Sequence, residues 1–346
     1  QPFVDRIVLA IDSKSWRKDL FPEAEYKGTR TQSDVVCWES VYQIYEEFKN
    51  IVAKKGVIVE QISGAEADDI LFAWSTYLNA QGKNCIVWTG DRDLIQLVDY
   101  SKATDGYTLW YYNTKKKLIT FEGFNNMMAQ DIDDRTEDED DLLFNLASKT
   151  AFLEKMRMDV MDWIKKNGID VEEINCDHFI FQKILTGDKS DNIKSVVSWV
   201  KGGRTYSITQ KQADKILDQY LKEEETFVID HMFSDAQVDK IVDIIYRVVN
   251  NSSKSQIKTR FNQNLDIMLL HHNTIPEPIQ EQMQSAIEKD AIIEPTLNKL
   301  TQMERILEGN KWMATKAENA PKSYDAFSDL DTSDEKPLTK NLNELF

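Results

Sequence analysis

The 346-residue sequence contains little cysteine or histidine and lacks any long apolar run. Its three cysteines, Cys37, Cys85 and Cys176, form no Cys-x-x-Cys pair, and its four histidines include one adjacent pair, His271 and His272. This scarcity argues against a zinc site or a disulfide scaffold and favours a reducing compartment. Because no apolar run could cross a bilayer, we expect a soluble, cytoplasmic protein without a membrane partner.

Positive charge is also scarce, since the formal net charge is -17 at pH 7. Such an excess of carboxylates would by itself argue against a nucleic-acid partner, because phosphate contacts require lysine and arginine. The charge is unevenly distributed, however. Residues 131–141 hold eight carboxylates against Arg135 alone, and the last thirty residues are acidic as well, whereas the remainder is closer to balance. A cluster that binds metal ions would account for further negative charge.

Carboxylates gather around a predicted helix start and a predicted strand end. Glu66, Asp68 and Asp69 precede apolar residues at helical spacing, and Asp91 and Asp93 follow the short apolar strand 85–89. Ligands of open α/β sheets bind at the carboxyl ends of the strands. Two simpler interpretations stand beside a metal site: carboxylates that complement a helix dipole, and an Asp-Arg-Asp turn or glycosyltransferase motif.

Two further acidic groups favour the metal site. Asp12 ends the apolar strand 3–12, and Asp188 and Asp191 follow the apolar helix 178–186. Together with the two groups above, they predict one site of oxygen ligands.

The order of predicted elements indicates an α/β fold with a parallel central sheet and flanking helices. Strands at 3–12, 57–59 and 85–89 alternate with helices at 39–53 and 66–82, and a hairpin spans 108–120. An all-helical part follows. We expect five segments: an α/β core at 1–122, an acidic and helical insertion at 123–172, a further region at 173–250, a helical region at 251–315, and a disordered acidic tail at 316–346.

The segment 13–30 is basic, contains interleaved aromatic residues, and shows no apolar periodicity that would bury it. Such a segment suits phosphate contact combined with base stacking. A solvated loop is the alternative.

Three motifs in order resemble those of the structure-specific 5′ nucleases, the flap endonucleases and polymerase-associated 5′ to 3′ exonucleases. They are Glu66-Ala-Asp-Asp69, Thr89-Gly-Asp-Arg-Asp-Leu94 and Gly187-Asp-Lys-Ser-Asp-Asn192, and Tyr26-Lys-Gly-Thr-Arg30 is similar to the family's arch motif. Within the family, the sequence most resembles the ribonucleases H of T-even bacteriophages. The resemblance implies a PIN-like nuclease core followed by an element like a helix–three-turn–helix.

The resemblance also implies roles for individual residues. Two Mg²⁺ ions, for which Mn²⁺ can substitute, would clamp the phosphodiester, and Lys27 and Arg30 would act as catalytic cations on its charge. Tyr26 would stack on an unpaired base. The first ion would be held by Asp12, Glu66, Asp68 and Asp91, and the second by Asp93, Asp188 and Asp191. Duplex phosphates would be held by Lys194, Lys201, Arg204 and Lys211.

The implied function is metal-dependent removal of RNA primers and 5′ flaps during phage DNA replication, in the host cytoplasm if the protein is phage-encoded. The substrates would be branched or nicked duplex DNA and RNA–DNA hybrids. One alternative is a non-catalytic protein of the same fold that binds branched DNA. Another is a PIN-type ribonuclease, which would cleave single-stranded RNA and would give residues 188–220 no role.

The sequence departs from the family pattern in three places. We expect the family's first strand, with its metal-binding Asp, to lie upstream of Gln1. The family's glycine-rich turn is replaced by Ser198-Trp-Val-Lys-Gly-Gly-Arg204, so a monovalent-ion site is not implied. The insertion has no recognised counterpart.

The final residues suggest a short docking peptide. Leu342, Leu345 and Phe346 bring apolar side chains back at an otherwise polar terminus. We expect the replication sliding clamp or a single-strand-binding protein as the partner.

Overall fold

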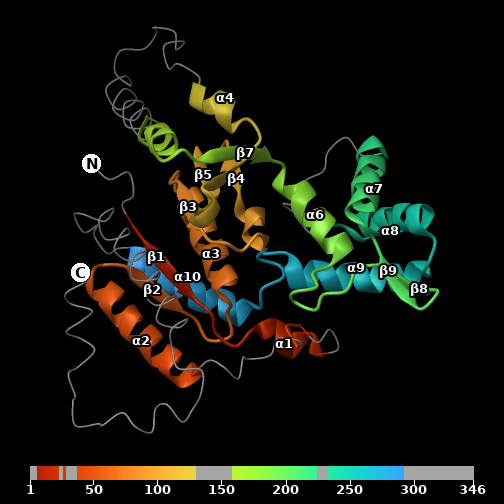
Figure 1. The fold of residues 1–346 in the computed structure, drawn as a ribbon, viewed down its shortest axis with the longest axis horizontal. Coiled ribbons are helices and arrows are strands. Elements are labelled where there is room, and N and C mark those ends of the chain that lie inside the picture. Colours follow the sequence, from red (N-terminus) through yellow and green to blue (C-terminus); the bar gives the residue numbers. More distant parts are fainter. Residues whose placement is uncertain (1–5, 23–25, 29–36, 130–157, 224–232, 292–346) are drawn as a thin grey trace. The chain divides into compact units, whose positions relative to one another are not determined.

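The computed structural model describes residues 6–22, 26–28, 37–129, 158–223 and 233–291 (Figure 1). The chain divides into two compact units. The first comprises Gln1–Ile11, Arg30–Gln61 and Ala286–Phe346, and the second comprises Asp12–Thr29 and Ile62–Ser285. None of the helices in the described ranges has both the length and the apolar character needed to cross a membrane.

The first unit contains a two-stranded parallel sheet and one long helix. Strand β1 (Val8–Ile11) pairs with β2 (Ile58–Gln61), and α2 (Trp38–Lys54) packs on β2. Phe48 and Val52 of α2 are buried with Val57, because apolar residues recur on one face of the helix. The predicted helix 39–53 is therefore confirmed, and Gly56 follows it with a φ of 84°.

The second unit is built on a five-stranded mixed sheet in the order β3-β5-β6-β7, with β4 also paired to β5. Strand β3 (Cys85–Trp88) is parallel to β5 (Gly106–Tyr112), and β5 forms an antiparallel hairpin with β6 (Lys117–Phe121). The predicted hairpin is thus confirmed. The shorter β4 (Asp99–Ser101) is antiparallel to β5. The structure confirms the α/β class, but β1 and β2 pair in a sheet of their own.

Strand β7 (Asp170–Ile174) is parallel to β6 and completes the sheet. It lies within the range 123–172 that we expected to be an insertion, so the end of that range belongs to the sheet. Helix α4 (Phe124–Ala129) and a helical stretch at 158–167 also fall near or within it, whereas the acidic run 131–141 lies outside the described residues.

Short helices carry the candidate site. Helix α1 (Trp16–Leu20) buries Trp16 and Arg17, α3 (Ala67–Asn79) begins after Glu66, and a 3-10 helix covers Asp93–Leu97. The expectation that segment 13–30 has nothing to bury it is therefore wrong. A single turn of helix hides two side chains, too few for a periodic pattern to be visible.

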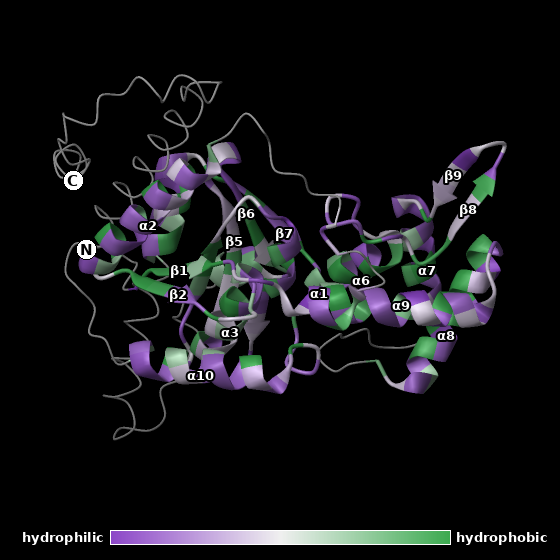
Figure 2. Cartoon of the chain, turned by 90° about the horizontal axis from the view of Figure 1, so that it is seen from below, coloured by the Kyte–Doolittle hydropathy of each residue, from purple (hydrophilic) through white to green (hydrophobic). Residues whose placement is uncertain are grey.

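A second core lies among four helices: α6 (Cys176–Thr186), α7 (Gln210–Glu223), α8 (Asp235–Val249) and α9 (Lys254–Met268). Figure 2 shows both hydrophilic and hydrophobic colours on α7 and α8, as expected for helices with one face in a core. Buried members include Phe181, Tyr220 and Phe261. Helix α10 (Glu277–Ala291) follows.

Between α6 and α7 the chain forms an antiparallel hairpin of β8 (Ser198–Lys201) and β9 (Arg204–Ser207). Gly202 and Gly203 make the turn, each with a positive φ, which suits a two-residue hairpin loop. The segment that departs from the family's glycine-rich turn is therefore a β-hairpin.

Strand β5 approaches α3 closely at Gly106, and a substitution there tests how tightly the two elements pack. A Cβ atom on Gly106 would lie 2.6 Å from the carbonyl oxygen and 2.8 Å from the Cα of Asn79, both backbone atoms. We predict that Gly106→Ala lowers the free energy of unfolding by about 2 kcal/mol, since overpacking forces backbone shifts. Urea denaturation measures this loss. Gly168→Ala measures the strain of a left-handed backbone alone, because its φ is +60° and its Cβ would meet nothing within 4 Å. A loss for Gly106→Ala below about 1 kcal/mol would contradict the prediction.

Candidate active site

The start of α3 places the first group of carboxylates. Glu66 is the residue before the helix, and its backbone N–H donates to the Asp69 carboxylate at 2.9 Å. The N–H of Ala67 donates to Asp12 Oδ1 at 2.8 Å. These contacts satisfy backbone donors that a helix start leaves free. The structure therefore brings Asp12 to the same helix start as Glu66 and Asp69.

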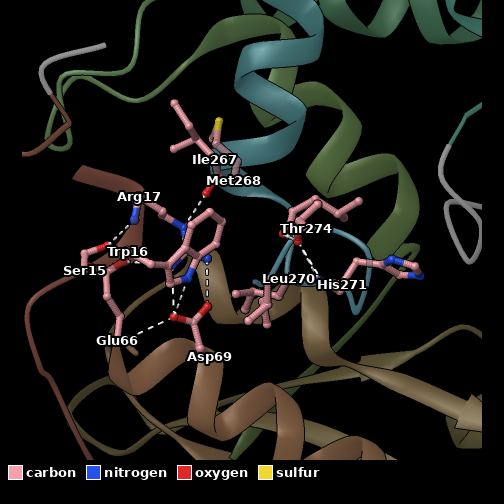
Figure 3. Close-up of polar contacts among 12 residues, drawn as sticks. Ser15, Trp16, Arg17, Glu66, Asp69, Ile267, Met268, Leu270, His271 and Thr274 are labelled. Atoms are coloured by element: carbon pink, nitrogen blue, oxygen red, sulfur yellow. Dashed lines mark hydrogen bonds and ion pairs between the residues drawn. The ribbon is translucent and has the colours of Figure 1, made fainter. Parts of the chain in front are cut away.

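Arg17 lies buried between two of these carboxylates (Figure 3). Its Nη2 donates to Asp69 at 2.8 Å, and its Nη1 donates to both Glu66 and Asp69 at 3.1 Å. Its Nε donates to the carbonyl of Ile267 at 2.8 Å, and Trp16 Nε1 donates to Asp69 at 3.1 Å. Burial alone would lower the pKa of Arg17, but Asp69 and Glu66 raise it. The arginine therefore stays charged and ties α1, α3 and α9 together.

Glu66 receives two further donors. Tyr26 donates its hydroxyl to Glu66 Oε2 at 3.0 Å, and Lys27 forms an ion pair with Oε1. Burial would raise the pKa of Glu66, but Lys27 and Arg17 outweigh it and lower the pKa. The Tyr26 ring is 7% exposed and belongs to the helical core. Its hydroxyl is thus committed to Glu66 in this structure, and burial followed by the charge of Glu66 raises its pKa.

The carboxylates of Asp68 and Asp91 are close enough for their charges to interact. Burial, and then the charge of Asp91, raises the pKa of Asp68 to about 7. Asp91 follows β3 and is held by the turn itself, because its N–H donates to Thr89 and its Oδ1 accepts from the N–H of Asp93. Trp110 donates to the backbone carbonyl of Asp91 at 2.8 Å. Burial is thus the main cause of the shift, and the neighbouring carboxylate Asp91 adds to it.

Asp93 and Asp188 meet across Lys183. The Lys183 ammonium of α6 forms an ion pair with Asp93 and lies 2.8 Å from Asp188 Oδ2. Burial leaves the pKa of Asp93 raised despite Lys183, whereas Lys183 and Ser190 outweigh burial and lower the pKa of Asp188 to about 2. Lys183 thereby links two carboxylates that are 95 positions apart in the sequence.

The loop after α6 is fixed by its own backbone and by one buried amide. Asp188 and Ile193 exchange backbone hydrogen bonds at 2.9 and 2.7 Å, and a Cβ on Gly187 would lie 2.4 Å from the Ile193 carbonyl. Asn264 of α9, 1% exposed, donates to the carbonyls of Ile184 and Lys194 at 2.9 Å.

Asp191 lies in the same loop. Its carbonyl accepts from the backbone N–H of Lys27 at 2.9 Å, which links the loop to the Tyr26 segment.

The carboxylates provide only oxygen donors, which suit a hard divalent cation. Burial, and in addition the charge of Asp91, raises the pKa of both Asp68 and Asp93, so negative charges lie near one another here. The donor chemistry therefore fits Mg²⁺. However, within the described ranges no three histidine, cysteine, aspartate or glutamate side chains are grouped to hold one ion. Instead, Arg17 and Lys27 form ion pairs with Glu66, and Lys183 forms ion pairs with Asp93 and Asp188.

The remaining predicted residues divide into two sets. Lys194, Lys201, Arg204 and Lys211 are exposed residues of the loop, the hairpin and α7. Arg30 and the terminal Leu342, Leu345 and Phe346 lie outside the described residues.

Sequence reasoning missed three residues that order the site. Arg17 was placed in a basic segment without a specific partner, and Lys183 and Asn264 were not singled out. A charged residue within the apolar helix 178–186, five positions before Asp188, was the available signal for Lys183. Nothing local distinguishes Arg17, since its partners are about 50 residues away.

Comparison with known proteins finds similarity in the N-terminal region. Residues 2–129 match the family model described as the 5′-3′ exonuclease N-terminal resolvase-like domain. DNA polymerase I of Chloroflexus aurantiacus is 31% identical over 96 residues, which are 28% of this chain and 10% of that protein. The 5′-3′ exonuclease of Buchnera aphidicola subsp. Acyrthosiphon pisum is 32% identical over 95 residues, which are 27% of this chain and 31% of that protein. The chain thus spans a third or less of these relatives.

Two solved structures show a distant likeness over more of the chain. A bacteriophage T5 flap endonuclease in a pseudo-enzyme–product complex with DNA and metal ions is 16% identical, with a TM-score of 0.44 and coverage of 82% of this chain and 83% of that one. The T5 5′-exonuclease with bound zinc is 17% identical, with a TM-score of 0.46 and the same coverage. Support for a nuclease of the 5′-3′ exonuclease type therefore comes from the family match of residues 2–129.

Removing the buried guanidinium tests its importance. We predict that Arg17→Met lowers the free energy of unfolding by about 3 to 5 kcal/mol, because Glu66 and Asp69 would remain buried without their counter-charge. Chemical denaturation measures the loss. Lys14→Met is the matched control on the same segment, since Lys14 pairs with Asp19 at an exposed site and should change stability little. A loss for Arg17→Met as small as the control's would show that the network does not hold the site together.

Proposed function

We propose that the protein is a divalent-metal-dependent 5′ nuclease that hydrolyses phosphodiesters at branched or nicked duplexes. The observation that carries the proposal is the pairwise proximity of carboxylates from three segments: Asp91 after β3 acts on Asp68 at the start of α3, and Lys183 links Asp93 with Asp188 after α6. The family match of residues 2–129 includes the first two of these segments. The third joins them through Lys183.

The ligand assignment follows the resemblance. Asp12, Glu66, Asp68 and Asp91 would hold one Mg²⁺, and Asp93, Asp188 and Asp191 would hold a second, partly through water. When bound, such ions supply Lewis-acid stabilisation of the phosphoryl oxygens and a water of lowered pKa.

The chain's own residues would orient the substrate. Lys27 lies beside Glu66, so its ammonium would balance the negative charge of the scissile phosphate once the substrate is present. Arg30 would add a second positive charge. Tyr26 is held by Glu66, and stacking on a base would require its ring to leave the helical core.

The duplex would lie along the basic segment after the acidic loop. Trp199 pairs with Tyr206 and Lys201 with Arg204 in the β8–β9 hairpin, so strand alternation places all four on one face. The two aromatic rings are stacked, with centroids 5.8 Å apart. Trp199 is partly buried against the helical core, whereas Tyr206 and the two cations are exposed. The two cations therefore suit contact with a sugar-phosphate backbone. Lys194 and Lys211 would extend the contact.

The biological substrate belongs to the same proposal. Removal of RNA primers and 5′ flaps during phage DNA replication would use this chemistry. Docking of the C-terminal peptide on a clamp or single-strand-binding protein stays a prediction.

One observation favours a non-catalytic alternative. The carboxylates are paired with lysine and arginine, and a protein that binds branched DNA without cutting it would need no other cations. Incubation with a 5′-flap duplex, a nicked RNA-primed duplex and single-stranded RNA, with and without Mg²⁺, separates the alternatives. Cleavage of the first two only with Mg²⁺ supports the proposal. Binding without cleavage supports the alternative, and cleavage of single-stranded RNA alone supports a PIN-type ribonuclease.

Two isosteric substitutions test the carboxylates. We predict that Asp68→Asn and Asp91→Asn each lower the cleavage rate by roughly 100-fold or more while the protein still folds and binds DNA, because each removes one charge of the site. Single-turnover cleavage and circular dichroism measure the two effects. Asp19→Asn is the control, since Asp19 pairs with exposed Lys14. Normal cleavage by either site variant would remove that residue from the assignment.

The hairpin can be tested through the salt dependence of binding. We predict that the double variant Lys201→Gln and Arg204→Gln weakens duplex binding and reduces the slope of log K against log[salt] by about 1.8, because two phosphate contacts are lost. Fluorescence anisotropy at several salt concentrations measures the slope. The double variant Lys254→Gln and Lys258→Gln is the matched control, since these lysines are already paired with Asp243 and Asp239. Equal slopes in all three proteins would exclude the hairpin from the interface.

A further inference from the structure

Lys183 occupies a position that the proposed reaction does not explain. Its ammonium binds Asp93 and Asp188, the two carboxylates that the resemblance assigns to the second metal ion. Asp93 begins the 3-10 helix after β3, and Asp188 follows α6. Because this 3-10 helix packs on α6, the packing of the two elements brings the carboxylates near one another, and the lysine lies between them.

The surroundings of the ammonium make its charge important. The side chains of Lys183, Asp93 and Asp188 are 20%, 28% and 16% exposed, so water screens their charges only partly. Asp188 Oδ1 already accepts from the N–H of Ser190 at 2.7 Å and from its hydroxyl at 2.5 Å. Asp188 Oδ2 has Lys183 as its partner. Without the ammonium, two carboxylates near a third, Asp91, would repel one another.

Lys183 and Arg17 hold carboxylates in different ways. The guanidinium of Arg17 is fixed by four hydrogen bonds, including one to the backbone of Ile267, and is 2% exposed. The Lys183 ammonium has two carboxylate partners and lies at the end of a flexible four-carbon chain. Lys183 can therefore leave its partners by rotating its side chain, whereas Arg17 cannot leave without opening the core.

We infer that Lys183 is a resident counter-ion, which balances the charge of Asp93 and Asp188 without metal and competes with a divalent cation for them. The inference rests on the proposed function, because it concerns the carboxylates of the same site. A divalent ion carries twice the charge of the ammonium, but it must displace the ammonium from at least one carboxylate. Lys183 is thus a positioning residue that sets the concentration of divalent cation at which the site fills.

The experiment follows thermal stability during a titration with MgCl₂, starting in EDTA, so it requires no cleavage. Lys183→Met keeps the length of the side chain and removes its charge. We expect this variant to melt at a lower temperature than the wild type in EDTA and to be stabilised by Mg²⁺ at a midpoint concentration about tenfold lower, because one charged hydrogen-bonded competitor is gone. Lys183→Arg keeps the charge and should retain a midpoint at or above that of the wild type.

Two comparisons make the result decisive. A residue with only a structural role would lower the melting temperature equally at every Mg²⁺ concentration, so an unchanged or higher midpoint in Lys183→Met overturns the inference. Lys258→Met is the control, since Lys258 pairs with Asp239 and Asp235 between α8 and α9 and should leave the midpoint unchanged. Lys183→Gln, which remains polar, carries the same expectation if Lys183→Met does not fold in EDTA.

Failure of the inference differs from failure of the proposed function. If the wild type cleaves a 5′-flap duplex with Mg²⁺ but all variants share its midpoint, only the role of Lys183 is wrong. If the wild type neither cleaves nor shows any Mg²⁺-dependent change in melting temperature, both are wrong.

Discussion

The candidate site depends on a buried arginine that balances two buried carboxylates. Burial of an ionised carboxylate is costly unless a counter-charge and hydrogen bonds compensate it. Arg17 supplies both to Glu66 and Asp69, and Trp16 completes the contacts of Asp69. A buried ion pair adds little net stability compared with an apolar core, but it fixes geometry. The network therefore orients Glu66 at the start of α3, and it does so by connecting α1, α3 and the end of α9.

The cations of the site differ in how firmly they are held, and this difference follows from their surroundings. Arg17 is enclosed and reaches the backbone of Ile267, so it belongs to the framework. Lys27 is held by its backbone, which donates to Asp191, while its ammonium is 16% exposed on Glu66. The framework cation and the lysines therefore have separate roles: the first positions carboxylates, and the others are close enough to solvent to exchange partners.

Much of the fold could be predicted because the relevant signals are local. The helix beginning at Glu66, the strand 85–88 and the hairpin 106–121 follow from periodicity and turn residues, and the carboxylates stand at element ends. Strand β7 could not be predicted in the same way. Three of its five residues are acidic, so its sequence resembles a loop. It forms a strand because its backbone pairs with β6 at the edge of the sheet.

The sequence named candidate site residues, whose roles stay a prediction, but it could not predict which residues they contact. Glu66, Asp68 and Asp91 were identified from type and spacing, yet their cationic partners come from other elements. Arg17 and Lys183 lie 52 and 90 positions from Asp69 and Asp93, respectively, and only the folded chain brings them together. Tyr26 illustrates the same limit. An aromatic residue in a basic segment suggests base stacking, whereas in the structure its hydroxyl donates to Glu66 and its side chain packs in the helical core.

The charge of the chain connects the two halves of the proposed function. Phosphodiesters and carboxylates repel one another, so a site of this composition favours a nucleic acid only when cations are present between them. In the proposed function, the exposed cations of the β8–β9 hairpin would attract the duplex. Occupation of the carboxylates by divalent cations would remove the repulsion locally. By linkage, the substrate must then raise the affinity for the cations as much as the cations raise the affinity for the substrate.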